Sequence, residues 1–126
     1  MTIALIAHDG KKPELVAFVL KNKQSLKGAK FITTATTGKH VAQAGFACES
    51  VLSGPSGGDA QIAARVADGD VDVVIFFRDP LGKHPHEPDV QMLMRICDVH
   101  DVPLATNPAS AELILEGLLV RYESAV

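Results

Sequence analysis

The sequence has no long hydrophobic run, no basic cluster and no metal-type cysteine spacing. Its longest apolar runs reach about six or seven residues, against the roughly 20 needed to span a bilayer. The formal net charge is -3 and no Lys/Arg run appears, which argues against nucleic acid as the main partner. Cys48 and Cys97 lie in apolar stretches and are expected to be small buried hydrophobic residues of a reducing compartment. The N-terminal MTIALIAHDG has no basic region or cleavage pattern, so we expect a cytoplasmic protein without a membrane partner.

What the sequence does contain is a regular alternation of strand and helix patterns. Its 126 residues, 47% of them hydrophobic and 21% charged, predict one globular domain over residues 1–126. Apolar runs predict strands at 2–7, 30–34, 48–52, 71–77 and 103–105. Helices are predicted at 13–22, 39–44, 59–68 and 89–100, and after Asn107 as a cap with Pro108 at the first position. The expected fold is α/β, a doubly wound (Rossmann-like) five-stranded parallel sheet.

The chemically distinctive residues come directly after the predicted strands. The first strand is followed by His8, Asp9 and Lys12, and the fourth by a loop with several ionisable groups. Since ligands of such sheets lie beyond the carboxyl ends of the strands, these residues are expected along one rim.

Two turns of this rim suit a phosphate. TTATTG, residues 33–38, joins a strand to a helix start, where free N–H groups and threonine hydroxyls can bind an anion. The glycines of SGPSGGD, residues 53–59, allow close approach of the backbone, and Asp59 then lies at a helix start. This stretch matches neither a P-loop nor the dinucleotide fingerprint. Helix capping by threonine and a dipole or capping role for Asp59 remain open alternatives.

The loop RDPLGKHPHEPD, residues 78–89, offers further titratable groups. A metal site on His84, His86, Glu87 and Asp89 is disfavoured, because helical ligand spacing and cysteine support are missing. A histidine beside carboxylates better suits proton transfer near neutral pH. A rigid surface loop with Asp89 as N-cap, and a solvated surface role for HDGKK, are the alternatives.

The segments IALIAHDGKK, TATTG, LSGPSGGDAQIA, VIFFRDP and HPHEPDVQMLMRI resemble, in this order and spacing, the methylglyoxal synthase family. The resemblance runs from Ile3 to about Leu115. It implies a methylglyoxal synthase-like domain that converts dihydroxyacetone phosphate to methylglyoxal and inorganic phosphate with no metal or organic cofactor. It also implies a homohexamer, often inhibited by phosphate. Related domains occur in carbamoyl phosphate synthetase and the purine-pathway cyclohydrolase, which share the fold but not this full set of carboxylates.

The resemblance also implies roles for individual residues. Asp59 matches the catalytic base and His86 the catalytic histidine, while Asp9, Asp79 and Asp89 match further active-site carboxylates. The matched substrate-binding positions are His8, Lys12, Thr34, Ala35, Thr36, Thr37, Ser53 and Gly54. Two departures stand out. Ala35 replaces a family glycine, which a negative φ would tolerate, and the basic residue near the family's C-terminus has only Arg121 as a candidate.

Two other functions remain open at this stage. A non-catalytic domain that senses a phosphorylated metabolite would need the phosphate turns but not Asp59, His86 and Asp89 together. A sugar-phosphate isomerase would use the same proton abstraction but reprotonate the intermediate.

Overall fold

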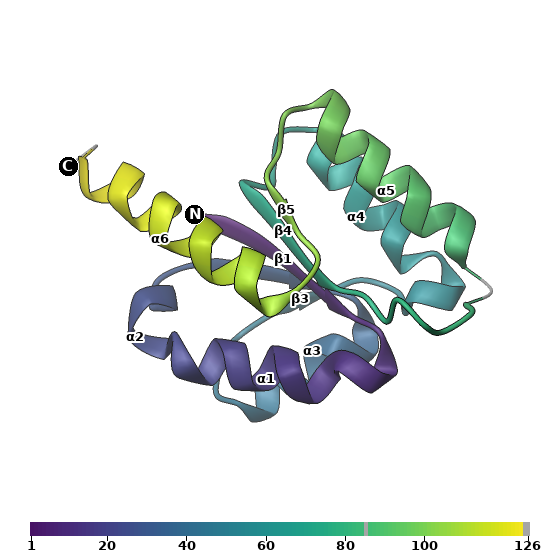
Figure 1. The fold of residues 1–126 in the computed structure, drawn as a ribbon, viewed down its shortest axis with the longest axis horizontal. Coiled ribbons are helices and arrows are strands. Elements are labelled where there is room, and N and C mark those ends of the chain that lie inside the picture. Colours follow the sequence, from purple (N-terminus) through teal and green to yellow (C-terminus); the bar gives the residue numbers. More distant parts are fainter. Residues whose placement is uncertain (85, 125–126) are drawn as a thin grey trace.

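The sheet has five parallel strands in the order β3-β2-β1-β4-β5 (Figure 1), as the sequence predicts. This computed structural model describes residues 1–84 and 86–124, with side chains to residue 121. The strands are β1 (Thr2–Ala7), β2 (Lys30–Thr33), β3 (Glu49–Ser50), β4 (Val73–Phe77) and β5 (Leu104–Ala105). The chain winds outward from β1 to β3, then returns to β4 beside β1. This reversal places the switch point of the sheet, where such folds bind ligands, at the carboxyl ends of β1 and β4.

Helices cover both faces of the sheet. They are α1 (Lys12–Lys21), α2 (Lys23–Leu26), α3 (Ala35–Gln43), α4 (Gly58–Ala67), α5 (Glu87–Val99) and α6 (Pro108–Ser124), with 3-10 turns η1 (Asp9–Lys11) and η2 (Gly54–Ser56). α4 and α5 lie together on one face, while α1, α3 and α6 lie on the other (Figure 1). Among the described helices, none is long and apolar enough to cross a membrane.

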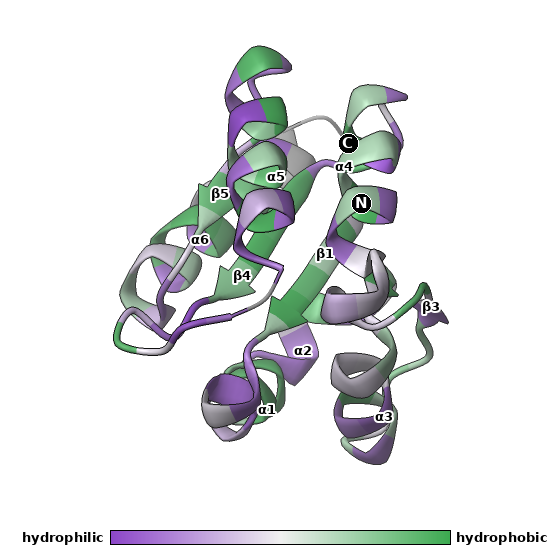
Figure 2. Cartoon of the chain, turned by 90° about the vertical axis from the view of Figure 1, so that its right-hand side faces the viewer, coloured by the Kyte–Doolittle hydropathy of each residue, from purple (hydrophilic) through white to green (hydrophobic). Residues whose placement is uncertain are grey.

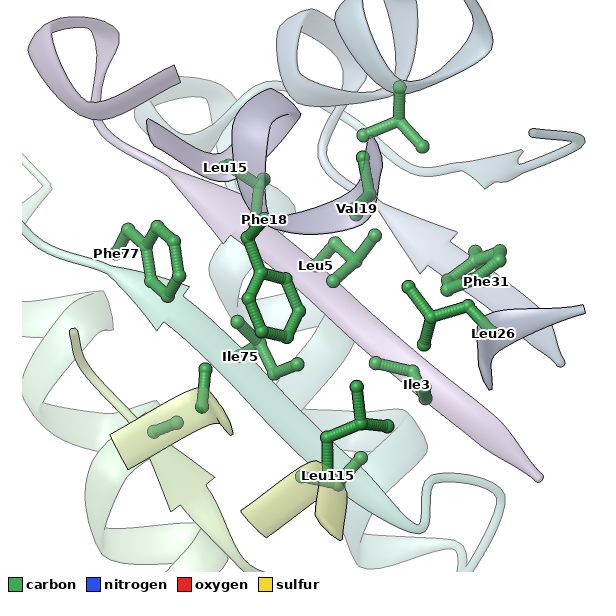
Figure 3. Packing of buried hydrophobic residues seen from close by; sticks show 14 of the residues in the cluster. Ile3, Leu5, Leu15, Phe18, Val19, Leu26, Phe31, Ile75, Phe77 and Leu115 are labelled. Atoms are coloured by element: carbon green, nitrogen blue, oxygen red, sulfur yellow. The ribbon is translucent and has the colours of Figure 1, made fainter. Parts of the chain in front are cut away.

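The central strands are apolar on consecutive positions because both of their faces are buried. Ile3 and Leu5 of β1 pack with Phe18 and Ile75 in the cluster under α1 and α6 (Figure 3). The alternate β1 residues Ala4 and Ile6 belong to the second cluster, under α4 and α5. β1 and β4 accordingly form the green centre of Figure 2. This two-sided burial explains why β1 could be predicted to the residue.

Several local predictions are confirmed at the helix ends. Asn107 caps α6, because its Oδ1 accepts the Ser110 N–H at 2.9 Å. Gly45 and Gly69 follow α3 and α4 with φ of +99° and +82°, a conformation that favours glycine. Ala35 begins α3. It is not among the described residues that have a positive φ, so its methyl group is tolerated as expected.

Other predictions are wrong in detail. α3 begins at Ala35 rather than at residue 39, and the short α2 was not anticipated. α5 begins at Glu87 with His86 at the N-cap position, so Asp89 lies inside the first turn and is not the cap. Cys97 is buried as expected, but Cys48 is only half-buried. Both cysteines are free thiols, and burial raises their pKa values.

Gly58 shows why the glycine-rich turn needs its glycines. A Cβ at this first residue of α4 would lie 1.9 Å from the Leu52 carbonyl oxygen and 2.8 Å from its carbon. Backbone cannot yield as a flexible side chain can, so we expect Gly58→Ala to lower the free energy of unfolding by about 3 kcal/mol. Urea denaturation measures this loss.

Gly117→Ala is the matched control for Gly58→Ala. Gly117 lies in α6, and no described atom comes within 4 Å of its built Cβ. This change should leave the unfolding free energy unchanged or raise it by up to about 1 kcal/mol, through helix propensity. Equal stability of the two variants would show that the turn has room for a side chain.

Candidate active site

A cavity of about 360 Å³ opens at the carboxyl ends of β1, β2 and β4. It is lined by Ile6, Ala7, His8, Asp9, Gly10, Lys12, Thr34, Thr36, Ser53, Gly54, Pro55, Asp59, Asp79, His84 and His86. The lining therefore combines the ends of three strands with the glycine-rich turn and the loop before α5. It unites at one site most of the residues that the sequence predicts on the rim.

Three predicted site residues do not line this cavity. Thr37 is fully buried behind it, where its Oγ1 accepts the Ala7 N–H at 3.3 Å and the Thr34 hydroxyl at 3.0 Å. Ala35 is the first residue of α3, and Asp89 lies in the first turn of α5. Thr37 thus lies on the buried side of residues 33–38, which we call the threonine turn, and supports it from behind. Asp89 lies beside the cavity rather than in its wall. Arg121 does not line the cavity and is exposed in the last turn of α6.

The threonine turn offers backbone donors rather than side-chain caps. Within the described residues, Thr34 at the N-cap of α3 makes no side-chain capping bond, so the capping interpretation is wrong for this hydroxyl. The first N–H groups of a helix have no intrahelical acceptor. Together with the exposed Thr36 at the cavity, they form a site that favours an anion.

Asp59 is a buried carboxylate without a hydrogen-bond donor. It lies in the first turn of α4, is 0% exposed, and neither carboxylate oxygen has a hydrogen-bond partner among the described residues. Burial raises the pKa of Asp59, the nearby Asp89 raises it further, and His86 opposes the shift. A carboxylate with a raised pKa is a stronger base than an ordinary aspartate. Asp59 is also not the cap of α4, because Gly57 occupies the N-cap position.

His86 stands directly beside this carboxylate. Its Nε2 lies 3.6 Å from Asp59 Oδ2, while its Nδ1 is buried and has no partner in the part of the chain that the structure describes. A Cβ at Gly54 would lie 3.0 Å from His86 Nε2 and 3.6 Å from Asp59 Oδ1. Glycine at this turn therefore leaves the room in which the imidazole and the carboxylate meet.

His8 is held as a neutral imidazole with one defined tautomer. Its Nδ1 accepts the Asp79 N–H at 2.9 Å, so the ring hydrogen resides on Nε2. Nε2 is buried and finds no acceptor among the residues described. Burial lowers the pKa of His8 to about 4, with smaller contributions from His84 and His86, which keeps the ring neutral at pH 7. His8 can therefore donate a hydrogen bond from Nε2 to a bound oxygen.

Lys12 brings a buried ammonium to the lining of the cavity. Its Nζ donates to the Ala7 carbonyl at 2.7 Å and to Asp9 Oδ1 at 2.8 Å. An ammonium has three donors, so one remains for a ligand. The bond to Lys12 lowers the pKa of Asp9, which stays ionised and orients the lysine.

Asp79 shapes the loop that follows β4. Its Oδ1 accepts the N–H groups of Leu81 and Gly82 at 3.1 and 3.2 Å, while its own N–H orients His8. Glu87, considered above as a metal ligand, is instead bonded to Arg78 at 3.2 Å. No group of three His, Cys, Asp or Glu residues in 1–84 and 86–121 is placed to hold a metal ion.

The sequence places His84 on the rim after the fourth strand and offers it as a metal ligand, but does not assign it to the binding cavity, which it lines. Its ring stacks on His8, with centroids 3.7 Å apart and planes at 18°. The available signal was its place in the same loop as His86, directly after a strand whose carboxyl end lies at the rim.

Comparison with known proteins agrees with this geometry. Residues 14–106 match the family model of the MGS-like domain. A methylglyoxal synthase of Thermus thermophilus is 57% identical over 114 residues, which cover 90% of each chain. The chain belongs to the methylglyoxal synthase family. The Burkholderia thailandensis methylglyoxal synthase is 53% identical over 120 residues, 94% of this chain and 92% of the relative.

A solved member of the methylglyoxal synthase family has the same fold. The crystal structure of methylglyoxal synthase from Elizabethkingia anophelis NUHP1 matches with a TM-score of 0.85 and 43% identity, over 90% of this chain and 76% of that one. The methylglyoxal synthase-like fold inferred from the motifs is thereby confirmed. In the chain described here, a buried carboxylate, three imidazoles and an ammonium line one cavity.

Proposed function

We propose that this chain is a methylglyoxal synthase, a lyase that converts dihydroxyacetone phosphate to methylglyoxal and inorganic phosphate. The observation that carries the proposal is the Asp59 carboxylate, fully buried and without a donor from any described residue, in the cavity that also holds Lys12. A buried carboxylate of this kind costs stability, and proteins retain such groups chiefly where they do chemistry.

Asp59 begins the reaction as the base. It removes a proton from the hydroxymethyl carbon beside the ketone, and the electron pair moves to the carbonyl oxygen to give an enediolate. His8 and His86 donate hydrogen bonds to the enediolate oxygens, and His86 carries a proton between them. These donors stabilise the negative charge that develops on the oxygens in the transition state, which lowers the barrier.

The intermediate then eliminates phosphate. Once the proton has moved to the former ketone oxygen, the electron pair on the terminal oxygen forms the aldehyde C=O, the C–C double bond shifts to the phosphate-bearing carbon, and the C–O bond to phosphate breaks. The resulting enol takes a proton at its methylene carbon and releases one from its oxygen to become methylglyoxal. Lys12 and the N–H groups of the threonine and glycine turns stabilise the departing phosphate. Asp9 holds Lys12, Asp79 orients His8, and Asp89 adjusts the proton affinity of Asp59. Thr34, Thr36, Ser53 and Gly54 complete the wall around the substrate.

The deciding experiment is a phosphate-release assay on dihydroxyacetone phosphate with a dicarbonyl trap. Equal amounts of phosphate and trapped methylglyoxal support the proposal. Binding without product would support a sensor domain, and an aldose product without phosphate release would support an isomerase. The buried Asp59 favours the enzyme over the sensor, since a phosphate-binding domain needs no such base.

We further propose a cytoplasmic homohexamer of single domains that span residues 1–126, with phosphate as an inhibitor. Exposed apolar side chains support an assembly: Leu81 is 94% exposed, Leu113 70% and Val120 61%. Native mass spectrometry measures the subunit number, and product inhibition by inorganic phosphate measures the affinity of the same anion site.

A further inference from the structure

His84 makes the ring contact with the shortest centroid distance among the described ring pairs of the active-site cavity. It comes from the loop between β4 and α5, and its ring lies parallel to that of His8, with centroids 3.7 Å apart. His84 Nε2 is buried and has no hydrogen-bond partner within the described chain, and the residue lines the cavity. A stacked ring with an unused nitrogen at a binding site points to a role beyond packing.

The other contacts of His8 differ from this parallel stack. The Asp79 N–H donates to Nδ1 at 2.9 Å. Phe76 and His86 meet the ring edge-on, with centroids 5.1 and 5.6 Å away and planes at 74° and 77°. Among these described ring contacts, only that of His84 is parallel, so the His84 ring covers a face of His8 and opposes its rotation.

We infer that His84 is a positioning residue for His8: its stacked ring fixes the His8 imidazole with Nε2–H aimed into the cavity and shields the ring from water. The inference rests on the proposed function, because it assigns His8 the task of donating to the substrate oxygen. His84 itself need not touch the reacting atoms.

The loop is shaped to allow this stack. A Cβ at Gly82 would lie 2.9 Å from His84 Nε2 and 2.6 Å from Asp79 Oδ2, so a side chain there would push both groups away. Asp79 meanwhile accepts the Leu81 and Gly82 N–H groups and holds the turn closed. The same turn therefore places Asp79 on the edge of His8 and His84 on its face.

Removal of His84 changes the electrostatics of His8 in a defined direction. Burial is the main cause that holds the pKa of His8 down to about 4, and His84 is the next. The other charged or titratable groups around this pair are His86, Arg78, Glu87, Asp9, Asp79 and Lys12. Without the His84 ring, water reaches His8 and the Coulombic effect of His84 that lowers the pKa of His8 is lost. Both effects favour protonated His8, so its pKa rises towards 6.5.

The test compares His84→Ala, which removes the ring, with His84→Phe, which keeps a stacking ring without nitrogens. Heteronuclear NMR of the imidazole nitrogens gives the pKa and tautomer of His8 directly, and kinetics give kcat and KM separately. We expect His84→Ala to raise the pKa of His8 by at least one unit and to lower kcat about tenfold with little change in KM. His84→Phe should keep kcat within about threefold, because the stack remains. Lys83→Ala, a change at an exposed neighbour, is the control.

Three results would overturn the inference. The first is a folded His84→Ala protein with unchanged pKa of His8 and unchanged kcat. The second is equal loss of kcat in the alanine and phenylalanine variants, which would remove the stack as the cause. If the alanine protein does not fold, His84→Gln serves as the variant without a stacked ring. The third overturning result is then an unaltered pKa of His8 in the His84→Gln protein. A wild-type protein that makes no methylglyoxal refutes the proposed function instead, while the NMR titration still decides whether His84 positions His8.

Discussion

Asp59→Asn is expected to lower kcat for methylglyoxal formation by about 10²-fold or more, while the KM for dihydroxyacetone phosphate changes little. The amide keeps the size and the buried position of the side chain but cannot accept the substrate proton. An interaction used only in the transition state affects kcat and leaves ground-state binding in place. Steady-state kinetics with the phosphate-release assay measure both constants.

The same variant should be no less stable than the parent protein. Burial raises the pKa of Asp59, so its favourable contribution to stability belongs to the protonated form and is lost as pH rises through the folded-state pKa. At pH 7 the buried ionised carboxylate therefore opposes folding, and asparagine removes that charge. Thermal unfolding should show an equal or higher midpoint. A loss of activity with retained stability separates a catalytic role from a structural one.

Asp68→Asn provides the matched control at the other end of the same helix. Asp68 lies at the exposed C-cap of α4, outside the cavity, and its replacement should leave kcat unchanged. If Asp59→Asn retains near-normal turnover while the protein is folded, Asp59 is not the base. The pH profile adds a second reading: in the parent protein kcat should fall as pH decreases through the raised pKa of this carboxyl group.

The strands and the rim of the site could be predicted because their signals are local. β1 and β4 are short apolar runs buried on both faces, and polar residues follow each directly. Parallel strands share their carboxyl ends at one edge, so order along the chain becomes proximity in space. This geometry brings His8, Asp59 and His86 to one cavity.

The start of α3 could not be read from the sequence because a long-range contact determines it. ATTG has weak helix propensity, and residues 33–38 read as a turn. In the structure, Thr37 Oγ1 accepts the Ala7 N–H of β1, a residue thirty positions earlier in the chain, and this bond anchors the first turn of the helix. Tertiary contact here overrides local preference.

The individual roles of the residues within the site could likewise not be predicted from the sequence. The family resemblance matches Thr37 to a substrate-binding position and Asp89 to an active-site carboxylate. In the structure, Thr37 accepts the Thr34 hydroxyl behind the turn, and Asp89 acts on Asp59 through its charge. His84 stacks on His8 although the two residues are 76 positions apart in the chain (84 minus 8). The path of the proline-containing loop that brings them together could not be predicted from the sequence. Side-chain orientation of this kind depends on packing rather than on spacing.

Lys12→Met is expected to reduce kcat/KM for dihydroxyacetone phosphate by about 10²-fold. Methionine keeps the unbranched length of the side chain and removes the ammonium, whose free donor we assign to the phosphate. A hydrogen bond to a charged group contributes about 1.5–3 kcal/mol, and 1.4 kcal/mol corresponds to tenfold in affinity. The loss should also weaken inhibition by inorganic phosphate by a similar factor, because free phosphate and the departing group share one site. Competition kinetics measure both.

The control for Lys12→Met lies next to it in the chain. Lys11 is paired with Glu14 at 3.3 Å and does not line the active-site cavity, so Lys11→Met should change neither constant appreciably. A ligand without phosphate gives the sharper comparison: binding of dihydroxyacetone, measured by NMR titration, should respond little to the loss of Lys12. Since Lys12 also holds the Ala7 carbonyl, a general collapse of the site would weaken both ligands alike. Equal losses for dihydroxyacetone and its phosphate would therefore remove Lys12 from the phosphate site, and selective loss for the phosphate ester would place the anion against this ammonium.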